Sequence, residues 1–156
     1  FQFPISKQIL NAKFQIIQTS EVVDFKWLEK VVALEQERMK KLSEIAELTE
    51  FFFKEPIYNR GLLAWKNMTG DAVLNNLKIL EAFLIKINKN NFKKNYLEKN
   101  LLEFIQKNKL TVGEMLWPMR AALSGRAASP GPFEIAKILG KEKTIKRIEA
   151  AIKKIA

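Results

Sequence analysis

The sequence predicts an all-α protein of two small helical subdomains, and three observations lead to this prediction. Apolar residues recur at steps of three, four and seven along most of the chain, which is the spacing of one helix face. No segment shows the polar–apolar alternation of a half-buried strand. Glycines and prolines fall between the periodic stretches, where they end one helix and allow the next to begin. A length of 156 residues with 47% hydrophobic residues suits one domain or two small lobes.

The first subdomain is predicted to hold a long helix. Ser20 or Asp24 is placed to cap it, and its apolar face would be Phe25, Leu28, Val32, Met39, Leu42, Ile45 and Leu48. Glu55-Pro56 interrupts this pattern, because the residue before a proline is pushed out of the α region. We therefore expect an N-terminal subdomain of residues 1–60, whose long helix carries Arg38, and a C-terminal subdomain of residues 61–156.

The second subdomain is predicted as a series of shorter helices. One opens at Asp71 with the apolar stripe Val73, Leu77, Leu80, Leu84 and Ile87, and the next ends near Lys107 with Leu97, Leu101 and Phe104 on its face. Thr111 and Glu114 have the spacing of a capping box. In the helix that they open, Pro118 should cause a kink or a restart, and Gly125 should stop the helix.

The last part of the chain opens with a tight turn at Ser129-Pro130-Gly131-Pro132, which places Pro132 at the first helical position. A short helix over residues 133–139 is expected to end at Gly140. The final helix is striped by isoleucines, namely Ile145, Ile148, Ile152 and Ile155.

Composition excludes several kinds of chemistry. The chain has no cysteine and no histidine, which removes thiolate nucleophiles, the commonest general base and the commonest metal ligand. No motif of a nucleophile with its base or of a phosphate-binding glycine loop is present. Lys and Arg number 27 against 17 acidic residues, a formal charge of +10. This excess favours a polyanion such as nucleic acid as partner. No apolar run reaches the roughly 20 residues that span a bilayer.

The most distinctive stretch joins a proline-containing helix to a proline–glycine corner. Arg120 follows Pro118, and the corner itself is Ser129, Pro130, Gly131, Pro132 and Phe133. An arginine can stack on a base or bond to it, a phenylalanine offers a ring, and a helix start offers free N–H groups. These residues suit a pocket for unstacked RNA bases. The alternative is a tight helix–helix corner with a buried ring.

The C-terminal helix carries cations around its isoleucines, namely Lys143, Lys146, Arg147, Lys153 and Lys154. Lys143, Lys146 and Arg147 are candidate contacts for a phosphate backbone. The alternative is a solubilised helix whose last-turn cations complement the helix dipole. Membrane-surface binding is less favoured, because packing on the preceding helices explains the isoleucines more simply.

Several segments together resemble the C-terminal anticodon-binding domain of bacterial-type glutamyl-tRNA synthetases. The most specific is Pro-x-Arg-x-Ala-Leu-Ser-Gly followed by Ser-Pro-Gly-Pro-Phe-Glu-Ile, within residues 117–139. Residues 38–45, the run Phe51-Phe52-Phe53 and the ending over residues 139–145 also match. The resemblance covers about residues 20–156, and the first twenty residues look like the tail of a preceding stem region.

The resemblance implies that a helical cage in the second subdomain grips the anticodon loop of the glutamate tRNA. It assigns the last anticodon bases to Arg120 and to the turn over residues 129–133. Arg38 matches an arginine that, in some members, contacts the first anticodon base and helps reject the glutamine tRNA. The alternative for Arg38 is an ion pair with Glu35. Pro132 stands where relatives can carry leucine, which leaves a side-chain contact there open.

The family's catalytic half holds ATP through HIGH-like and KMSKS-like motifs, and neither occurs in this sequence. We therefore expect a monomeric recognition module without a catalytic site or cofactor of its own. Its partners would be the tRNA and the catalytic domain of a cytoplasmic parent, a glutamate–tRNA ligase using ATP and Mg²⁺. The start at Phe1 also suggests a fragment. Two alternatives are a protein-interaction module of this fold that does not bind tRNA, and the similar cage of class I lysyl-tRNA synthetases.

Overall fold

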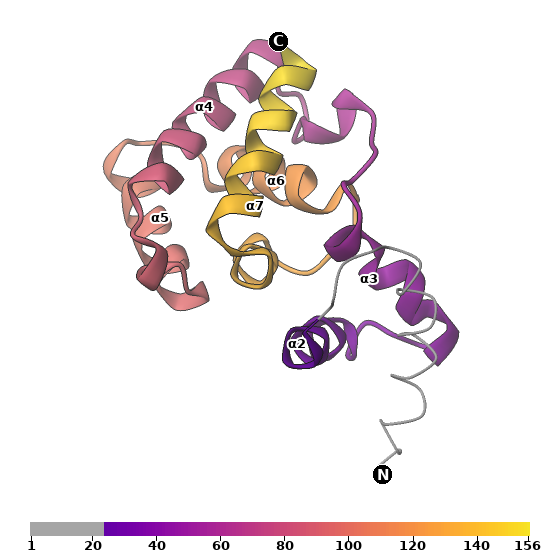
Figure 1. Ribbon diagram of the computed structural model, residues 1–156. Helices are drawn as coiled ribbons and strands as arrows, with labels where there is room; N and C mark the ends of the chain where they lie inside the picture. Colours follow the sequence, from indigo (N-terminus) through magenta and orange to yellow (C-terminus); the bar gives the residue numbers. More distant parts are fainter. Residues whose placement is uncertain (1–23) are drawn as a thin grey trace. The chain divides into compact units, whose positions relative to one another are not determined.

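A computed structural model describes residues 24–156, which are helical with connecting turns and contain no strand (Figure 1). The predicted all-α class is confirmed for these residues. The chain divides into two units, Phe1–Lys54 and Glu55–Ala156. The boundary between the units falls after Lys54 and not at residue 60, because the residues that follow Lys54 belong to the second unit. A carboxylate oxygen of Glu55 lies 3.5 Å from the Nε of Arg147, which is near the end of the chain. Ser20 and the expected stem tail lie outside the described residues.

The first unit contains α2 (Phe25–Glu35), the 3₁₀ helix η1 (Leu42–Glu44) and α3 (Ile45–Phe53). The side chain of Asp24 caps α2 as predicted, by accepting a hydrogen bond from the backbone N–H of Lys26. The single long helix expected here is wrong, because the chain turns after α2. The physical reason is that one helix cannot bury its own apolar stripe. Packing α3 against α2 buries Leu28, Val31, Phe51 and Phe52.

The second unit contains four α-helices and two 3₁₀ helices among the described residues. They are η2 (Arg60–Leu63), α4 (Gly70–Lys86), η3 (Lys89–Asn91), α5 (Lys94–Lys107), α6 (Val112–Ser124) and α7 (Pro132–Ile155). In Figure 1, α7 (yellow) lies against α4, and it also contacts α5 and α6. The predicted stripe of α4 is buried at Val73, Leu77, Leu80 and Leu84. The helix opens at Gly70, with Thr69 as its cap.

Helix α6 runs without a restart through Pro118. The proline cannot donate to the carbonyl of Glu114, and that carbonyl accepts a 3.0 Å hydrogen bond from Asn76 of α4 instead. Thr111 occupies the N-cap position, but its side chain makes no cap hydrogen bond. The predicted capping box is therefore wrong. Thr111 is exposed, so water can satisfy both its hydroxyl and the first N–H groups of the helix.

Two glycines with positive φ end helical stretches where predicted. Gly125 (φ 66°) ends α6 in the left-handed conformation. Gly140 (φ 78°, ψ 172°) breaks the backbone within α7. Next to it, the ammonium of Lys141 donates to the carbonyls of Ile85 (2.8 Å) and Ile87 (2.6 Å) at the end of α4. The glycine–lysine pair thus fixes α7 on α4, because cations suit the C-terminal end of a helix.

Candidate nucleic-acid interface

The structure brings Arg120 and Ser129 together at the corner between α6 and α7. Arg120 lies on the second half of α6, and its Nη1 group donates to the hydroxyl of Ser129 at 3.4 Å. Its Nη2 group donates to the carbonyl of Ala127 at 2.9 Å. The side chain is half-buried, so it is fixed by the corner and still reaches solvent. A planar guanidinium held in this way can recognise a base by stacking or by paired hydrogen bonds.

Trp117 lies one helical turn before Arg120 and supports it. The guanidinium carbon of Arg120 lies 4.5 Å from the indole centroid, which is a cation–π contact. The indole N–H in turn donates to the carbonyl of Leu62 in η2 at 2.9 Å. Trp117 is not among the site residues that the sequence predicts. The signal that could have found it is the three-residue spacing to Arg120, which places both side chains on one helix face.

The turn that precedes α7 is tightly built. Ser129 and Pro130 are buried, and the hydroxyl of Ser129 donates to the carbonyl of Pro130 at 3.1 Å. Gly131 is the N-cap of α7 and Pro132 begins the helix, as predicted. Both are half-buried, so Gly131 and Pro132 form the accessible part of the corner.

Phe133 is placed differently from the prediction. Its side chain is only 4% exposed, so its ring cannot stack on a base in this conformation. The alternative of a corner with a buried ring holds for this residue. The reason is its helical position: Phe133 shares the inward face of α7 with Ala136, which is also buried.

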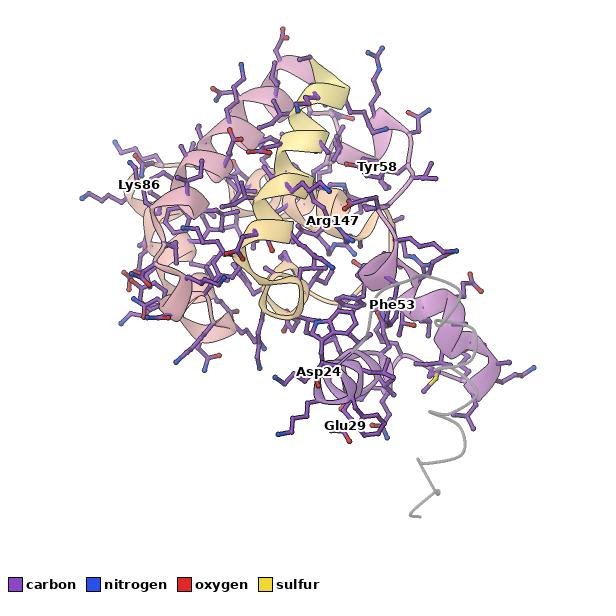
Figure 2. The ribbon with its side chains drawn as sticks, in the orientation of Figure 1. Asp24, Glu29, Phe53, Tyr58, Lys86 and Arg147 are labelled. Carbon is purple, nitrogen blue, oxygen red and sulfur yellow. The ribbon has the colours of Figure 1, made fainter. Side chains whose placement is uncertain are left out.

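The cations of the last helix fall into two groups. Lys143 and Lys146 are exposed, and the ammonium of Lys146 lies 3.5 Å from a carboxylate oxygen of Glu55. Both lysines remain candidates for phosphate contacts. Arg147, which is labelled in Figure 2, is only 3% exposed. Its guanidinium donates to the carbonyl of Leu123. Burial lowers the pKa of Arg147, and the neighbouring carboxylate of Glu55 opposes this shift.

In this structure Arg147 is therefore not placed to make the expected phosphate contact. The buried face of the final helix is Thr144, Arg147, Ile148 and Ala151. The predicted isoleucine stripe is only partly right: Ile148 is buried, while Ile145, Ile152 and Ile155 are half-exposed. The buried face of the helix therefore includes Arg147 in place of most of the isoleucines. The long side chain of Arg147 reaches the backbone carbonyl of Leu123 and the carboxylate of Glu55, which compensate its buried charge.

Arg38 lies in the turn after α2, not on a helix. Its Nε lies 3.1 Å from a carboxylate oxygen of Glu35, so the ion pair foreseen as the alternative is present. The Glu35 side chain is 1% exposed and the Arg38 side chain 36%. A buried carboxylate thus holds an arginine that remains accessible to solvent.

The described residues offer no metal site or membrane-spanning helix, and a surface hollow lies away from Arg120. Residues 24–156 contain no group of three or more acidic side chains that could hold a metal ion, and no helix among them is long and apolar enough to cross a membrane. An open hollow of about 430 Å³ lies near the first turn of α6, lined by residues that include Trp65, Lys66, Thr69 and Glu114. It does not include Arg120.

An all-helical unit that fixes a half-buried arginine beside a proline–glycine corner, on a strongly basic chain, has the features of an RNA-binding domain. The chain belongs to the anticodon binding domain family, whose family model matches residues 7–152.

Its curated relatives are longer proteins. A glutamate–tRNA ligase of Clostridium botulinum is 36% identical over 118 residues, which cover 74% of this chain and 24% of that protein. A glutamate–tRNA ligase of Clostridium tetani is 32% identical over 154 residues, which cover 97% of this chain and 29% of the relative. The matched region thus spans only 24% to 29% of the length of these relatives.

The crystal structure of a glutamate tRNA ligase from Elizabethkingia meningosepticum, in complex with its amino acid, has the same fold. The TM-score is 0.78 at 23% sequence identity, and the match covers 96% of this chain and 29% of that one.

Proposed function

We propose that this chain reads the anticodon loop of the glutamate tRNA and thereby contributes specificity to tRNA glutamylation. The observation that carries the proposal is the guanidinium of Arg120, held at the corner by Ala127 and Ser129 and still half-exposed. Membership of the anticodon binding domain family and the similarity to glutamate–tRNA ligases support the choice of RNA.

Recognition divides between long-range attraction and local reading. The formal charge of +10 draws the phosphate backbone towards the chain, and the exposed Lys143 and Lys146 can contact individual phosphates. Base identity is then read by Arg120 together with the accessible Gly131 and Pro132, and by Arg38 in the first unit. Phe133 and Arg147 act inside the second unit by fixing its helices.

The chemistry of glutamylation is assigned to the rest of a longer polypeptide, a glutamate–tRNA ligase that uses ATP and Mg²⁺. No chemical step is proposed for this chain. Its contribution is to bind and orient the tRNA.

The test is a titration of the 156-residue chain with labelled anticodon stem-loops over a salt series. The glutamate stem-loop is compared with a stem-loop of the same stem and an altered anticodon, and with a lysine stem-loop. We expect tighter binding of the glutamate stem-loop and an affinity that falls with salt, with a log–log slope of about −0.7 per contacted phosphate.

Equal affinities for all stem-loops would contradict anticodon reading. A preference for the lysine stem-loop would favour the lysyl-type cage, and no binding at low salt would favour a protein-interaction module.

A further inference from the structure

We propose that Trp117 is a positioning residue for RNA recognition, which holds the guanidinium of Arg120 in its reading position before RNA arrives. The inference rests on the proposed function and adds a residue to which no role in recognition has been assigned.

The indole of Trp117 is itself fixed. Its N–H donates to the carbonyl of Leu62 at 2.9 Å, across 55 positions of sequence. Leu62 lies in η2, which is anchored at its start by the side chain of Asn59, an acceptor for the N–H of Gly61 at 2.9 Å. Trp117 itself is half-buried. The hydrogen bond to η2 and this partial burial therefore restrict rotation of the ring.

The fixed ring then supports Arg120. The guanidinium carbon lies 4.5 Å from the ring centroid, so a cation rests on the indole. The nitrogens of the same guanidinium donate to Ala127 and to Ser129. An arginine side chain free in solvent would lose much rotational entropy on binding RNA. The stack on Trp117 restricts the side chain beforehand, which favours binding through preorganisation.

A purely structural role for Trp117 makes a different prediction. If the indole only filled space between η2 and α6, its removal would weaken RNA binding to the same extent with or without the arginine. If it acts through Arg120, its removal matters only while Arg120 is present. A double-mutant cycle separates these two cases.

The experiment measures the affinity of the 156-residue chain for the glutamate anticodon stem-loop at fixed salt. The variants are Trp117→Leu, Arg120→Ala and both together, with thermal unfolding followed in parallel. We expect Trp117→Leu to weaken binding about three- to tenfold, the size of a partly desolvated cation–π contact. In the Arg120→Ala background, we expect the same substitution to change the affinity less than about twofold. Trp117→Phe retains an aromatic face and should recover part of the affinity.

Trp65→Leu is the matched control. Trp65 is also half-buried and also makes a cation–π contact, because the ammonium of Lys66 lies 4.2 Å from the centroid of its ring. None of the described contacts of Trp65 is with Arg120. Its effect on affinity should be the same in both backgrounds. If Trp117→Leu does not fold, Trp117→Phe decides by the same cycle.

Equal losses in the two backgrounds would overturn the inference and leave the proposed function intact. A parent chain that does not distinguish the glutamate stem-loop would instead overturn the proposed function.

Discussion

The side-chain amide of Asn76 in α4 donates a 3.0 Å hydrogen bond to the backbone carbonyl of Glu114 in α6. In a regular helix this carbonyl would accept from the N–H four residues later, and that position is Pro118. A side chain from a neighbouring helix thus replaces a bond that the proline cannot make. This replacement explains how α6 continues through the proline and delivers Arg120 to the corner.

Replacing Asn76 by alanine should destabilise the chain by about 1–2 kcal/mol, because the half-buried carbonyl loses its partner. Urea denaturation of the variant measures this loss. Asn75→Ala is the matched control, since Asn75 is exposed on the same helix and should change stability by less than about 0.5 kcal/mol. Equal losses for the two variants would show that the hydrogen bond is not the cause.

Arg120→Ala is expected to weaken binding of the glutamate anticodon stem-loop by about 1–3 kcal/mol, the range of a bidentate base contact. Arg120→Lys should recover little of this loss, because an ammonium provides neither a fork of donors nor a planar group. Fluorescence anisotropy at fixed salt measures both. Lys99→Ala removes an exposed charge from α5 as control and should lower affinity only slightly. Unchanged affinity in Arg120→Ala would remove this arginine from the interface.

Arg38→Gln is expected to reduce the preference for the glutamate over the glutamine anticodon stem-loop. The reason is that Glu35 holds the accessible guanidinium of Arg38 in place, at 3.1 Å, and glutamine cannot reproduce its charge or its donors. The measurement is the ratio of the two affinities. Lys30→Gln on α2, where Lys30 is exposed, controls for loss of a positive charge. A ratio equal to that of the parent would contradict a role of Arg38 in anticodon discrimination and leave only its structural ion pair with Glu35.

Stability should decline at alkaline pH through Tyr58. Burial raises the pKa of its phenol from 10.0 to about 12, and the nearby charge of Arg147 opposes the shift only in part (Figure 2). The folded chain therefore retains the phenol proton at pH values where the unfolded chain has lost it. The stabilising contribution is complete below pH 10 and is lost between pH 10 and about 12.

The comparison of the parent with Tyr58→Phe isolates this contribution from the titration of the lysines. We expect the difference in unfolding free energy between the two proteins to shift against the parent as the pH rises from about 9 to about 11. A difference that is constant over this range would show that the phenol titrates normally.

Gly140→Ala should cost about 1–3 kcal/mol, because φ 78° and ψ 172° form a conformation that is nearly restricted to glycine. Apart from its chain neighbours and the adjacent backbone of its own helix, no atom lies within 4 Å of the added methyl group, so the loss would come from backbone strain rather than from a clash. Gly70→Ala also meets no such atom and has no positive φ, and it should leave stability unchanged or slightly raise it. Chemical denaturation of both variants gives the comparison.

Local patterns in the sequence were sufficient to predict much of this molecule. Asp24, Gly125 and Pro132 act where predicted, because caps and stops depend on a residue's own backbone and on neighbours a few positions away. The stripe of α4 is equally local, since a helix of that length has one clear apolar face. The fold class, and the proximity of Arg120 to Ser129, follow from such signals.

Predictions that depended on distant partners were less successful. The chain of the first unit turns after Glu35, and α3 packs against α2. Of the predicted stripe only Leu28 is buried, while Phe25 and Leu42 are exposed, because the contact between the two helices uses Val31, Phe51 and Phe52 instead. Phe133 and Arg147 are candidate RNA contacts by residue type, and both are buried. Their types alone do not show which face of α7 meets the core.

The sequence by itself determined that the chain is helical, basic and without histidine or cysteine, and it determined some helix boundaries, such as those at Asp24, Gly125 and Pro132. The tertiary structure decided which cations are accessible and which are buried, and it connected Trp117 to Leu62 and Asn76 to Glu114. The physical reason is the distance along the chain over which each kind of interaction acts. Caps and periodicity act within a few residues, whereas burial and partner choice depend on segments that only the packed core brings together.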